Sequence, residues 1–251
     1  MHEPPAPAVT LITGAGRGIG AATARLLAAR GHDLALGYAQ DADAAEALAT
    51  VLRAPGRRVI CVRADLADEA QVLAMFARVD AELGPLTGLV NNAGIVAPAL
   101  RLDEMEPARW QRLFGVNVLG TLLCCREAVR RMSTRHGGRG GAIVNLSSRA
   151  AQLGSPGVYV DYAASKGAID SLTLGLAREV IAEGVRVNGV RPGIIETEIH
   201  AASGMDVASA AAGIPIRRLG RAEEVAEAIA WLLSDAASYT VGAMLDVAGG
   251  R

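Results

Sequence analysis

The sequence predicts an α/β fold: a Rossmann-like, doubly wound parallel sheet of about seven strands with helices on both faces, in a single domain. Short apolar runs without polar alternation recur along the chain, which is typical of strands covered on both faces. A helical pattern follows each of these runs, as in right-handed βαβ units. Hydrophobic residues make up 51% of the chain but aromatic residues only 3%, which favours tightly packed helices and buried strands.

The elements can be placed in order along the chain. The expected strands lie at 8–13, 33–38, 58–65, 86–94, 140–148, 184–193 and 243–250. The expected helices lie at 20–30, 44–54, 69–83, 106–132, 162–183 and 222–234. No linker divides the chain, so we expect one domain over 8–251 after a short disordered tail at 1–7. The loop at about 196–215 is rich in small residues and is expected to act as a substrate lid.

Charge and composition argue against several classes of partner. The formal net charge is −1 without a long run of one sign, so neither nucleic acid nor an anionic membrane is expected to bind. No apolar run approaches the roughly 18 residues of a membrane span, and the N-terminus lacks the pattern of a secretory signal. Three cysteines, Cys61, Cys124 and Cys125, fit neither a disulfide framework nor a metal site. We therefore expect a cytoplasmic protein without a metal.

A glycine-rich segment at 13–20, TGAGRGIG, directly follows the first expected strand and opens the first helix. Such a turn lets the backbone approach a pyrophosphate, and the helix N-terminus supplies N–H donors. Because position 19 is Ile19, the spacing departs from the simple dinucleotide motif, and Gly14, Gly18 and Gly20 are the glycines that fit. The alternative is a tight turn that binds no ligand.

The end of the second strand indicates which dinucleotide binds. An acidic side chain there usually binds the ribose 2′-hydroxyl of NAD, but this chain has Gly37 and Tyr38. Arg17, within the glycine loop, could pair with a 2′-phosphate instead. We therefore expect NADP(H) rather than NAD(H). Asp41 keeps the alternative open, because the loop could turn it inward.

Further cofactor contacts are expected along the same edge of the sheet. Ile19 and Tyr38 belong to the expected cofactor-binding set because they lie in the glycine loop and at the end of the second strand. Asp65 and the adjacent Leu66 follow the third expected strand and are expected to lie at the adenine edge of the cofactor. The alternative role of Asp65 is to cap the next helix.

Tyr162 and Lys166 form the strongest chemical signal in the chain. Residues at i and i+4 share one face of a helix, so the two side chains project together. A nearby ammonium favours the phenolate and is expected to lower the pKa of Tyr162, which makes the tyrosine a better acid or base at neutral pH. Lys166 is the only lysine among the basic residues, which are otherwise arginines, so the position demands a compact ammonium. Tyr159 is the competing tyrosine, but Ala163 stands four residues after it.

Motifs spread along the whole chain resemble the classical short-chain dehydrogenase/reductase family. They are TGAGRGIG, NNAG at 91–94, GVNVLG, IVNLSS, YAASK and RPGIIET, in the order of the family and at its approximate spacing. The resemblance implies a catalytic tetrad of Asn117, a serine, Tyr162 and Lys166, in which the lysine also binds the nicotinamide ribose. Alignment on IVNLSS selects Ser148, with Ser147 as the alternative, to bind the substrate oxygen. Asn117 would hold a water that relays protons through Lys166.

The resemblance also implies further cofactor contacts and an assembly. The expected contacts come from residues at the carboxyl ends of the fourth and sixth strands: Asn92, Ala93, Gly94, Pro192, Gly193, Ile195 and Thr197. An asparagine amide of NNAG is expected to brace the neighbouring strands. The helices at 106–133 and 162–183 resemble the dimer-forming pair of the family, and the last strand resembles part of its tetramer interface. A homo-oligomer, dimer or tetramer, is expected.

These observations predict an oxidoreductase that transfers a hydride between NADP(H) and a carbonyl or secondary alcohol, with Tyr162 as the acid or base. The alternative is a non-catalytic protein that senses a dinucleotide on the same fold. The sequence does not name the substrate or the physiological direction.

Overall fold

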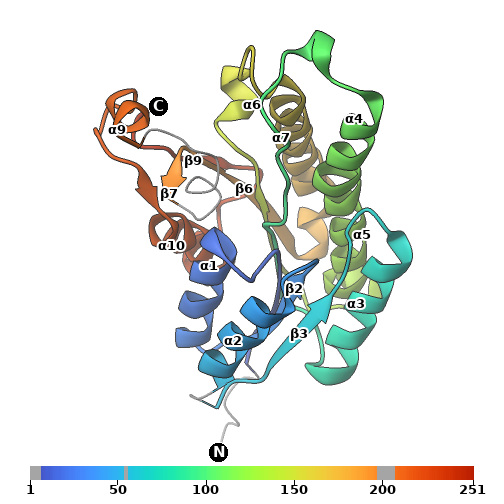
Figure 1. The fold of residues 1–251 in the computed structure, drawn as a ribbon. Coiled ribbons are helices and arrows are strands. Elements are labelled where there is room, and N and C mark those ends of the chain that lie inside the picture. The colour runs from blue at the N-terminus through green and yellow to red at the C-terminus, as the bar shows by residue number, and fades with distance from the viewer. Residues whose placement is uncertain (1–6, 54–55, 197–206) are drawn as a thin grey trace, which may run out of the picture.

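The computed structural model describes residues 7–53, 56–196 and 207–251. Its centre is a parallel sheet of seven strands in the order β3-β2-β1-β4-β5-β6-β9, with helices on both faces (Figure 1). The strands are β1 (Val9–Thr13), β2 (Asp33–Tyr38), β3 (Val59–Arg63), β4 (Gly88–Asn91), β5 (Gly141–Leu146), β6 (Val185–Pro192) and β9 (Met244–Val247). The predicted doubly wound fold is confirmed.

Two layers of helices cover the sheet. The helices are α1 (Gly18–Ala29), α2 (Ala42–Arg53), α3 (Glu69–Glu82), α4 (Pro107–Phe114), α5 (Gly120–Met132), α6 (Ala150–Leu153), α7 (Val160–Val180), α9 (Val207–Ala212) and α10 (Ala222–Leu233). A small separate pair, β7 (Ile195–Glu196) and β8 (Gly220–Arg221), lies outside the main sheet. Helices α1, α2 and α10 cover one face, and α3, α5 and α7 cover the other (Figure 1).

The strands are apolar on both sides because each side faces a hydrophobic core. Val9 and Leu11 of β1 belong to the core under α3, α5 and α7, whereas Ile12 belongs to the core under α1, α2 and α10. All three side chains are at most 2% exposed. This double burial explains the continuous apolar runs in the sequence.

The register of the sheet aligns the strand ends that matter for the site. Thr13 pairs with Gly37, and Ile12 with Val90, so β1 lies between β2 and β4. Asn91, the last residue of β4, pairs with Asn145 of β5. The strand order reverses between β1 and β4, and ligands of open parallel sheets bind outside the carboxyl ends at such a point.

The expected single helix at 106–132 contains an interruption. Helix α4 runs into a π-helical segment, Gly115–Leu119, and α5 follows without a break in helical dihedral angles at Gly115 and Gly120. The wide turn contains Asn117. Single π-turns inside α-helices often mark functional sites, because they move one side chain out of the regular helical register.

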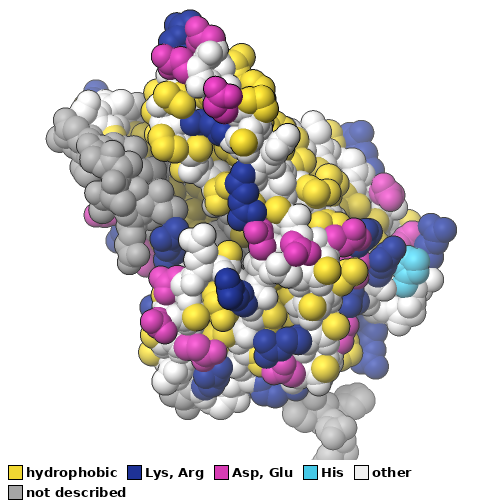
Figure 2. Space-filling view, turned by 45° about the vertical axis from the view of Figure 1, so that its right-hand side comes forward, with side chains coloured by type: hydrophobic (Ala, Val, Ile, Leu, Met, Phe, Trp, Pro, Cys, Tyr) yellow, Lys and Arg dark blue, Asp and Glu magenta, His cyan; other side chains and the backbone are white. Residues whose placement is uncertain are grey.

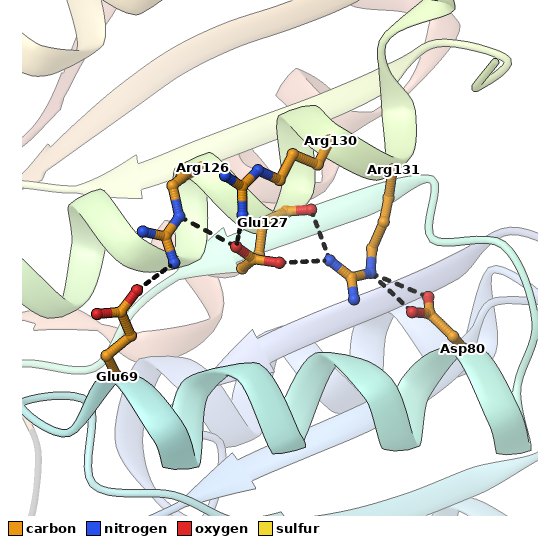
Figure 3. Close-up of polar contacts among 6 residues, drawn as sticks. All are labelled: Glu69, Asp80, Arg126, Glu127, Arg130 and Arg131. Carbon is orange, nitrogen blue, oxygen red and sulfur yellow. Dashed lines mark hydrogen bonds and ion pairs between the residues drawn. The ribbon is translucent and has the colours of Figure 1, made fainter. Parts of the chain in front are cut away.

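A charged network links α5 to α3 (Figure 3). It comprises Glu69, Asp80, Arg126, Glu127, Arg130 and Arg131. The Glu127 carboxylate is only 5% exposed and accepts hydrogen bonds from three arginines of its own helix, at 2.9–3.0 Å. Arg126 also donates a hydrogen bond to Glu69 at the start of α3, and Arg131 donates one to Asp80 near the end of α3. The two helices are thus held together at both ends of their contact.

Candidate active site

The glycine loop connects β1 to α1 and is shaped by close backbone approach. Gly14 has φ +64°, and a Cβ there would lie 2.9 Å from the Cα of Ala93. Gly18 has φ +53°, and a Cβ on Gly20 would lie 2.3 Å from the carbonyl oxygen of Gly14. Only glycine satisfies these positions without strain. The three glycines selected from the sequence are therefore the three that the turn requires, whereas Gly16 has more room.

The N-terminus of α1 fits a bound pyrophosphate. Arg17 occupies the N-cap position, its side chain does not cap the helix, and no acidic residue lies in the first turn. By contrast, the Asp68 carboxylate accepts hydrogen bonds from Ala70 and Gln71 at the start of α3. The first N–H groups of a helix need an acceptor, and in α1 no side chain of the N-cap residue supplies one. A phosphate group can take that place.

The end of β4 braces the glycine loop. The Asn92 amide donates to the carbonyl oxygens of Thr13 and Gly14, at 3.0 and 2.8 Å. The Thr13 hydroxyl accepts from the backbone N–H groups of Asn92 and Ala93, each at 3.1 Å. The structure thus contains the expected bracing by an asparagine amide. The role of Thr13 was missed in the sequence, although its place at the start of the glycine motif could have signalled it.

The acidic residues near the expected adenosine end have partners of their own. Asp41 is exposed, and its carboxylate accepts from Ala44 N at 2.9 Å in the first turn of α2. The alternative role of Asp65 as a helix cap is wrong, because Asp68 caps α3. Instead, the Asp65 carboxylate forms an ion pair of 2.7 Å with Arg112, which the sequence did not reveal. This pair joins the loop after β3 to α4, and the place of Asp65 at the adenine edge stays a prediction.

Other expected cofactor residues lie around the same edge of the sheet. Leu66 is buried against Gly120, since a Cβ added to that glycine would lie 2.6 Å from the Leu66 Cβ. Ile19 and Tyr38 are half-buried at the start of α1 and the end of β2. Gly193 lies close to the residue that follows β9, because a Cβ added there would lie 2.9 Å from the Ala248 Cα.

The expected contacts after β6 are only partly described. Pro192 is buried, and Ile195 is buried in the short β7 strand, where it pairs with Gly220 of β8. Thr197 lies outside the described residues, as does half of the expected lid at 196–215.

Lys166 lies buried beside Tyr162 on α7. Its side chain is 4% exposed, and its Nζ donates to the carbonyl oxygen of Leu146 at 2.7 Å. The same Nζ lies 5.7 Å from the centre of the Tyr162 ring. Burial lowers the pKa of Lys166 to about 8, although the negative charge of Asp170 opposes this shift. The two side chains therefore lie together in space, as their helical spacing predicts.

The expected direction of the Tyr162 pKa is wrong for this structure. Burial raises the pKa of Tyr162 above its ordinary value, and a hydrogen bond with Ser148 only opposes the rise. Transferring the phenolate out of water costs more free energy than the hydrogen bond with Ser148 contributes. The phenol therefore stays protonated at neutral pH.

The two candidate serines occupy different surroundings. The Ser147 hydroxyl is buried and donates to the carbonyl oxygen of Lys166 at 3.0 Å, which is a structural bond. Ser148 is half-buried, and its hydroxyl lies beside Tyr162. The geometry thus favours Ser148 over Ser147 as the serine that faces a substrate.

Asn117 joins α7 to the loop after β4. Its side chain accepts from Ile95 N at 2.8 Å and donates to Ile95 O at 3.0 Å and to the Ser165 hydroxyl at 3.2 Å. A Cβ on Gly94 would lie 3.4 Å from the Lys166 Nζ and 3.5 Å from the Asn117 Oδ1, so these atoms surround one point. The structure brings Asn117 and Lys166 into one region with Ser148 and Tyr162.

Known proteins are similar to this chain over nearly its whole length. The family model described as enoyl-(acyl carrier protein) reductase matches residues 14–251. An uncharacterized oxidoreductase of Escherichia coli (strain K12) is 52% identical over 97% of this chain and 100% of its own length. The cis-4-hydroxycyclohexanecarboxylate dehydrogenase of Sinomonas cyclohexanicum is 45% identical, covering 100% of this chain and 98% of its own.

A solved short-chain dehydrogenase from Burkholderia cenocepacia J2315, in complex with NADP, superimposes with a TM-score of 0.90. It is 35% identical and covers 96% of each chain. The chain belongs to the short-chain dehydrogenase/reductase family. It is accordingly an oxidoreductase of this family, and the resemblance read from the sequence motifs is confirmed.

This short-chain dehydrogenase/reductase also contains an ion pair near the site that the motifs did not indicate. Arg109 of α4 pairs with Asp161, the residue before Tyr162. Spacing could not reveal this pair, because the partners are far apart in the sequence. The NNAG and IVNLSS motifs meet as well, since Asn91 donates to Asn145 at 2.9 Å and to the sulfur of Cys125 at 3.2 Å, which braces β4 and β5 as expected for an asparagine amide of NNAG.

The three cysteines are buried, and charged side chains of both signs lie on the face drawn in Figure 2. Cys124 and Cys125 are buried on α5, and Cys61 is buried on β3. Basic and acidic side chains are interspersed over the face drawn in Figure 2, with apolar side chains between them. Within the described ranges, no helix is long and apolar enough to cross a membrane.

Proposed function

We propose that the protein is an NADP(H)-dependent oxidoreductase that interconverts a carbonyl compound and a secondary alcohol. The observation that carries this proposal is the convergence of Ser148, Tyr162 and Lys166 beside a glycine loop that fits a pyrophosphate. Within the family, the name of the Sinomonas relative, a dehydrogenase of a hydroxycyclohexane carboxylate, also supports an alcohol or ketone as the substrate.

In the proposed reaction, the bound nicotinamide supplies or accepts the hydride. The Ser148 and Tyr162 hydroxyl groups bind the substrate oxygen, and the Tyr162 phenol donates a proton to it during reduction. The raised pKa of Tyr162 suits this direction, because the group must carry a proton before it can donate one. The Lys166 ammonium beside the tyrosine, together with Asn117, would return a proton to the phenol after each turnover.

Selection of NADP(H) is proposed for Arg17. Arg17 is exposed at the N-cap of α1, and the end of β2 offers Tyr38 rather than a carboxylate. Asp41, the acid nearest in sequence, already accepts a hydrogen bond from the first turn of α2. An exposed guanidinium without a competing carboxylate favours a 2′-phosphate.

We also propose that the protein works in the cytoplasm as a homo-oligomer assembled through α5 and α7. Leu119 and Leu122 lie three residues apart around the start of α5 and are 48% and 43% exposed. Leu174 and Ile181, seven residues apart at the end of α7, are 42% and 38% exposed. Apolar side chains at helical spacing on neighbouring elements are suited to pack against a second copy.

The test of the proposed activity is Tyr162→Phe, assayed with NADPH and a panel of cyclic and acyclic ketones. We expect turnover to fall by about 10²-fold or more, because general acid catalysis contributes at least that much. NADPH binding, followed by nicotinamide fluorescence, should stay nearly unchanged. Retained turnover in the variant would remove Tyr162 as the proton donor. Binding of NADPH without turnover of any ketone or alcohol by the wild-type protein would instead favour a dinucleotide sensor.

A further inference from the structure

Arg109 of α4 lies in an unusual position for an arginine near the first turn of α7. Its side chain is only 10% exposed, and that of its partner Asp161 only 2%. The Arg109 Nε donates to one Asp161 oxygen at 2.7 Å, and a second guanidinium nitrogen donates to the other at 3.2 Å. This two-point geometry fixes both the distance and the angle between the groups.

The same guanidinium reaches the loop after β4. Its third nitrogen donates to the carbonyl oxygen of Pro98, in the loop at 94–101. Arg109 therefore joins three segments: α4, this loop, and the start of α7. The arginine also lines a cavity of about 350 Å³, whose other walls include Ile95, Leu100 and Leu113.

The ion pair between Arg109 and Asp161 contacts the backbone of Tyr162, the proposed proton donor. The Asp161 Oδ1, which accepts from Arg109, also accepts from the N–H of Tyr162 at 2.9 Å. Burial acts to raise the pKa of Asp161, but hydrogen bonds from Arg109 and Tyr162 outweigh it and hold the pKa below its usual value. Asp161 thus stays ionised, as a carboxylate in the first turn of a helix prefers.

The loop at 94–101 has two further attachments beside the same tyrosine. Asn117 binds both backbone groups of Ile95, and Leu100 N donates to the carbonyl oxygen of Val158 at 3.1 Å. Both of these attachments involve neutral groups. Arg109 supplies the charged one, and without it Asp161 would be a buried carboxylate lacking its cation. Such a group takes up a proton or moves toward water, and either change would displace the neighbouring backbone at position 162.

We propose that Arg109 is a positioning residue, which holds Asp161 and the Pro98 carbonyl in one arrangement and thereby sets the place of the Tyr162 phenol. This inference rests on the proposed function, in which Tyr162 donates the proton. The hydrogen bonds of the Arg109 side chain go to Asp161 and Pro98, so it would act on Tyr162 through Asp161. A lysine carries its three donors on a single nitrogen and has no planar fork, so it would replace the contacts of Arg109 with Asp161 and Pro98 only in part.

The experiment measures the position of the tyrosine and the rate of the reaction separately. Protein labelled with ¹³C at tyrosine Cζ gives one resonance for each of its four tyrosines, and Tyr162→Phe identifies the signal of Tyr162. In Arg109→Gln we expect this resonance to shift or broaden while that of the exposed Tyr239 stays in place. At saturating substrate, kcat should fall by about 10²-fold, the cost of a displacement of roughly 1 Å. The NADPH Kd should change by less than about threefold, since the glycine loop is untouched.

A double variant separates positioning from stability. Replacing a buried ion pair by apolar side chains of similar size often preserves stability. We therefore expect Arg109→Met combined with Asp161→Leu to unfold near the wild-type temperature but to keep the displaced Tyr162 resonance and the low kcat. Arg109→Lys should recover part of the wild-type kcat and move the Tyr162 resonance part of the way back to its wild-type position. Glu82→Gln, which removes an exposed ion pair with Arg78 on α3, is the matched control and should change neither.

Two results would overturn the inference. One is an unshifted Tyr162 resonance in Arg109→Gln, and the other is full recovery of kcat in the double variant, which would make the pair merely structural. If Arg109→Gln does not fold, the Tyr162 resonance of the double variant tests the inference in its place. Because the resonance requires no substrate, failure of the proposed activity would be visible as absent wild-type turnover and would not be confused with failure of the positioning role.

Discussion

Residues of the glycine loop differ in how strictly the fold determines which amino acid stands at each position. Gly14 and Gly18 have positive φ angles, and Gly20 leaves no space for a Cβ, so the glycine motif follows from geometry. Arg17, in the same loop, is exposed and does not cap the helix with its side chain, so the fold does not require an arginine there. A residue that the fold does not need is a candidate for ligand recognition.

At the scale of this residue, we expect Arg17→Ala to weaken NADPH binding by about tenfold or more while leaving NADH binding within about twofold. A charged hydrogen bond to a phosphate contributes roughly 1.5–3 kcal/mol, and NADH lacks that phosphate. Titration of the nicotinamide fluorescence with each cofactor measures both affinities. Equal losses for the two cofactors would mean that Arg17 does not read the 2′-phosphate. Arg25→Ala, further along α1, provides the control.

Among the elements, the contact between α3 and α5 depends on one nearly buried carboxylate (Figure 3). Burial acts to raise the pKa of Glu127, but hydrogen bonds from Arg131 and Arg126 and the charge of Arg130 outweigh it, so the pKa is lowered. A carboxylate with a lowered pKa in the folded state stabilises the fold above its ordinary pKa and loses that contribution as the pH falls.

We expect Glu127→Gln to lower the free energy of unfolding by about 1–2 kcal/mol at pH 7, since its arginine partners remain partly in contact with water. The difference from the wild type should shrink as the pH falls below the ordinary pKa of a glutamate, and it should vanish once the pH lies below the lowered pKa of folded Glu127, where the group is protonated in both states. Urea unfolding at a series of pH values measures this. Glu82→Gln, which breaks an exposed pair, should cost less than about 0.5 kcal/mol. A difference that grew toward acidic pH would contradict the assigned role of the charge.

For the whole molecule, the open question is how copies assemble. Helices α4, α5 and α7 lie on the same side of the molecule (Figure 1), and exposed apolar side chains occur on α5 and α7. A second exposed group consists of Tyr239, which precedes β9, and Leu245, which belongs to it. One apolar face permits a dimer only, whereas a second interface formed by these side chains would permit a dimer of dimers.

We expect Leu122→Glu to reduce the molecular mass in solution by half or more, because a buried carboxylate at an interface has no partner. Sedimentation analysis measures this mass, and the far-ultraviolet circular dichroism should stay that of the folded wild type. Leu73→Glu on α3, a similarly exposed leucine outside the proposed face, should leave the mass unchanged. An unchanged mass in Leu122→Glu would exclude this face as the interface.

The sequence alone determined the parallel sheet, the glycine turn and the pairing of Tyr162 with Lys166. Each of these follows from local signals: apolar runs, glycine spacing and the helical period of four residues. The helix at 106–132 was correctly located, but its π-turn at Gly115–Leu119 was not foreseen. A π-turn adds one residue to a single helical turn, and the motifs and their spacing do not reveal this shift.

Only the tertiary structure decided which distant residues meet. It paired Asp65 with Arg112 and Asp161 with Arg109, and it gave the Ser147 hydroxyl a backbone partner. It also raised the pKa of Tyr162, where an isolated helix would let the nearby ammonium lower it. Ion pairs between segments depend on how the chain folds back on itself, and pKa shifts depend on burial. Ion pairs between segments and pKa shifts therefore cannot be derived from a local stretch of sequence, whereas turn geometry and helical spacing can.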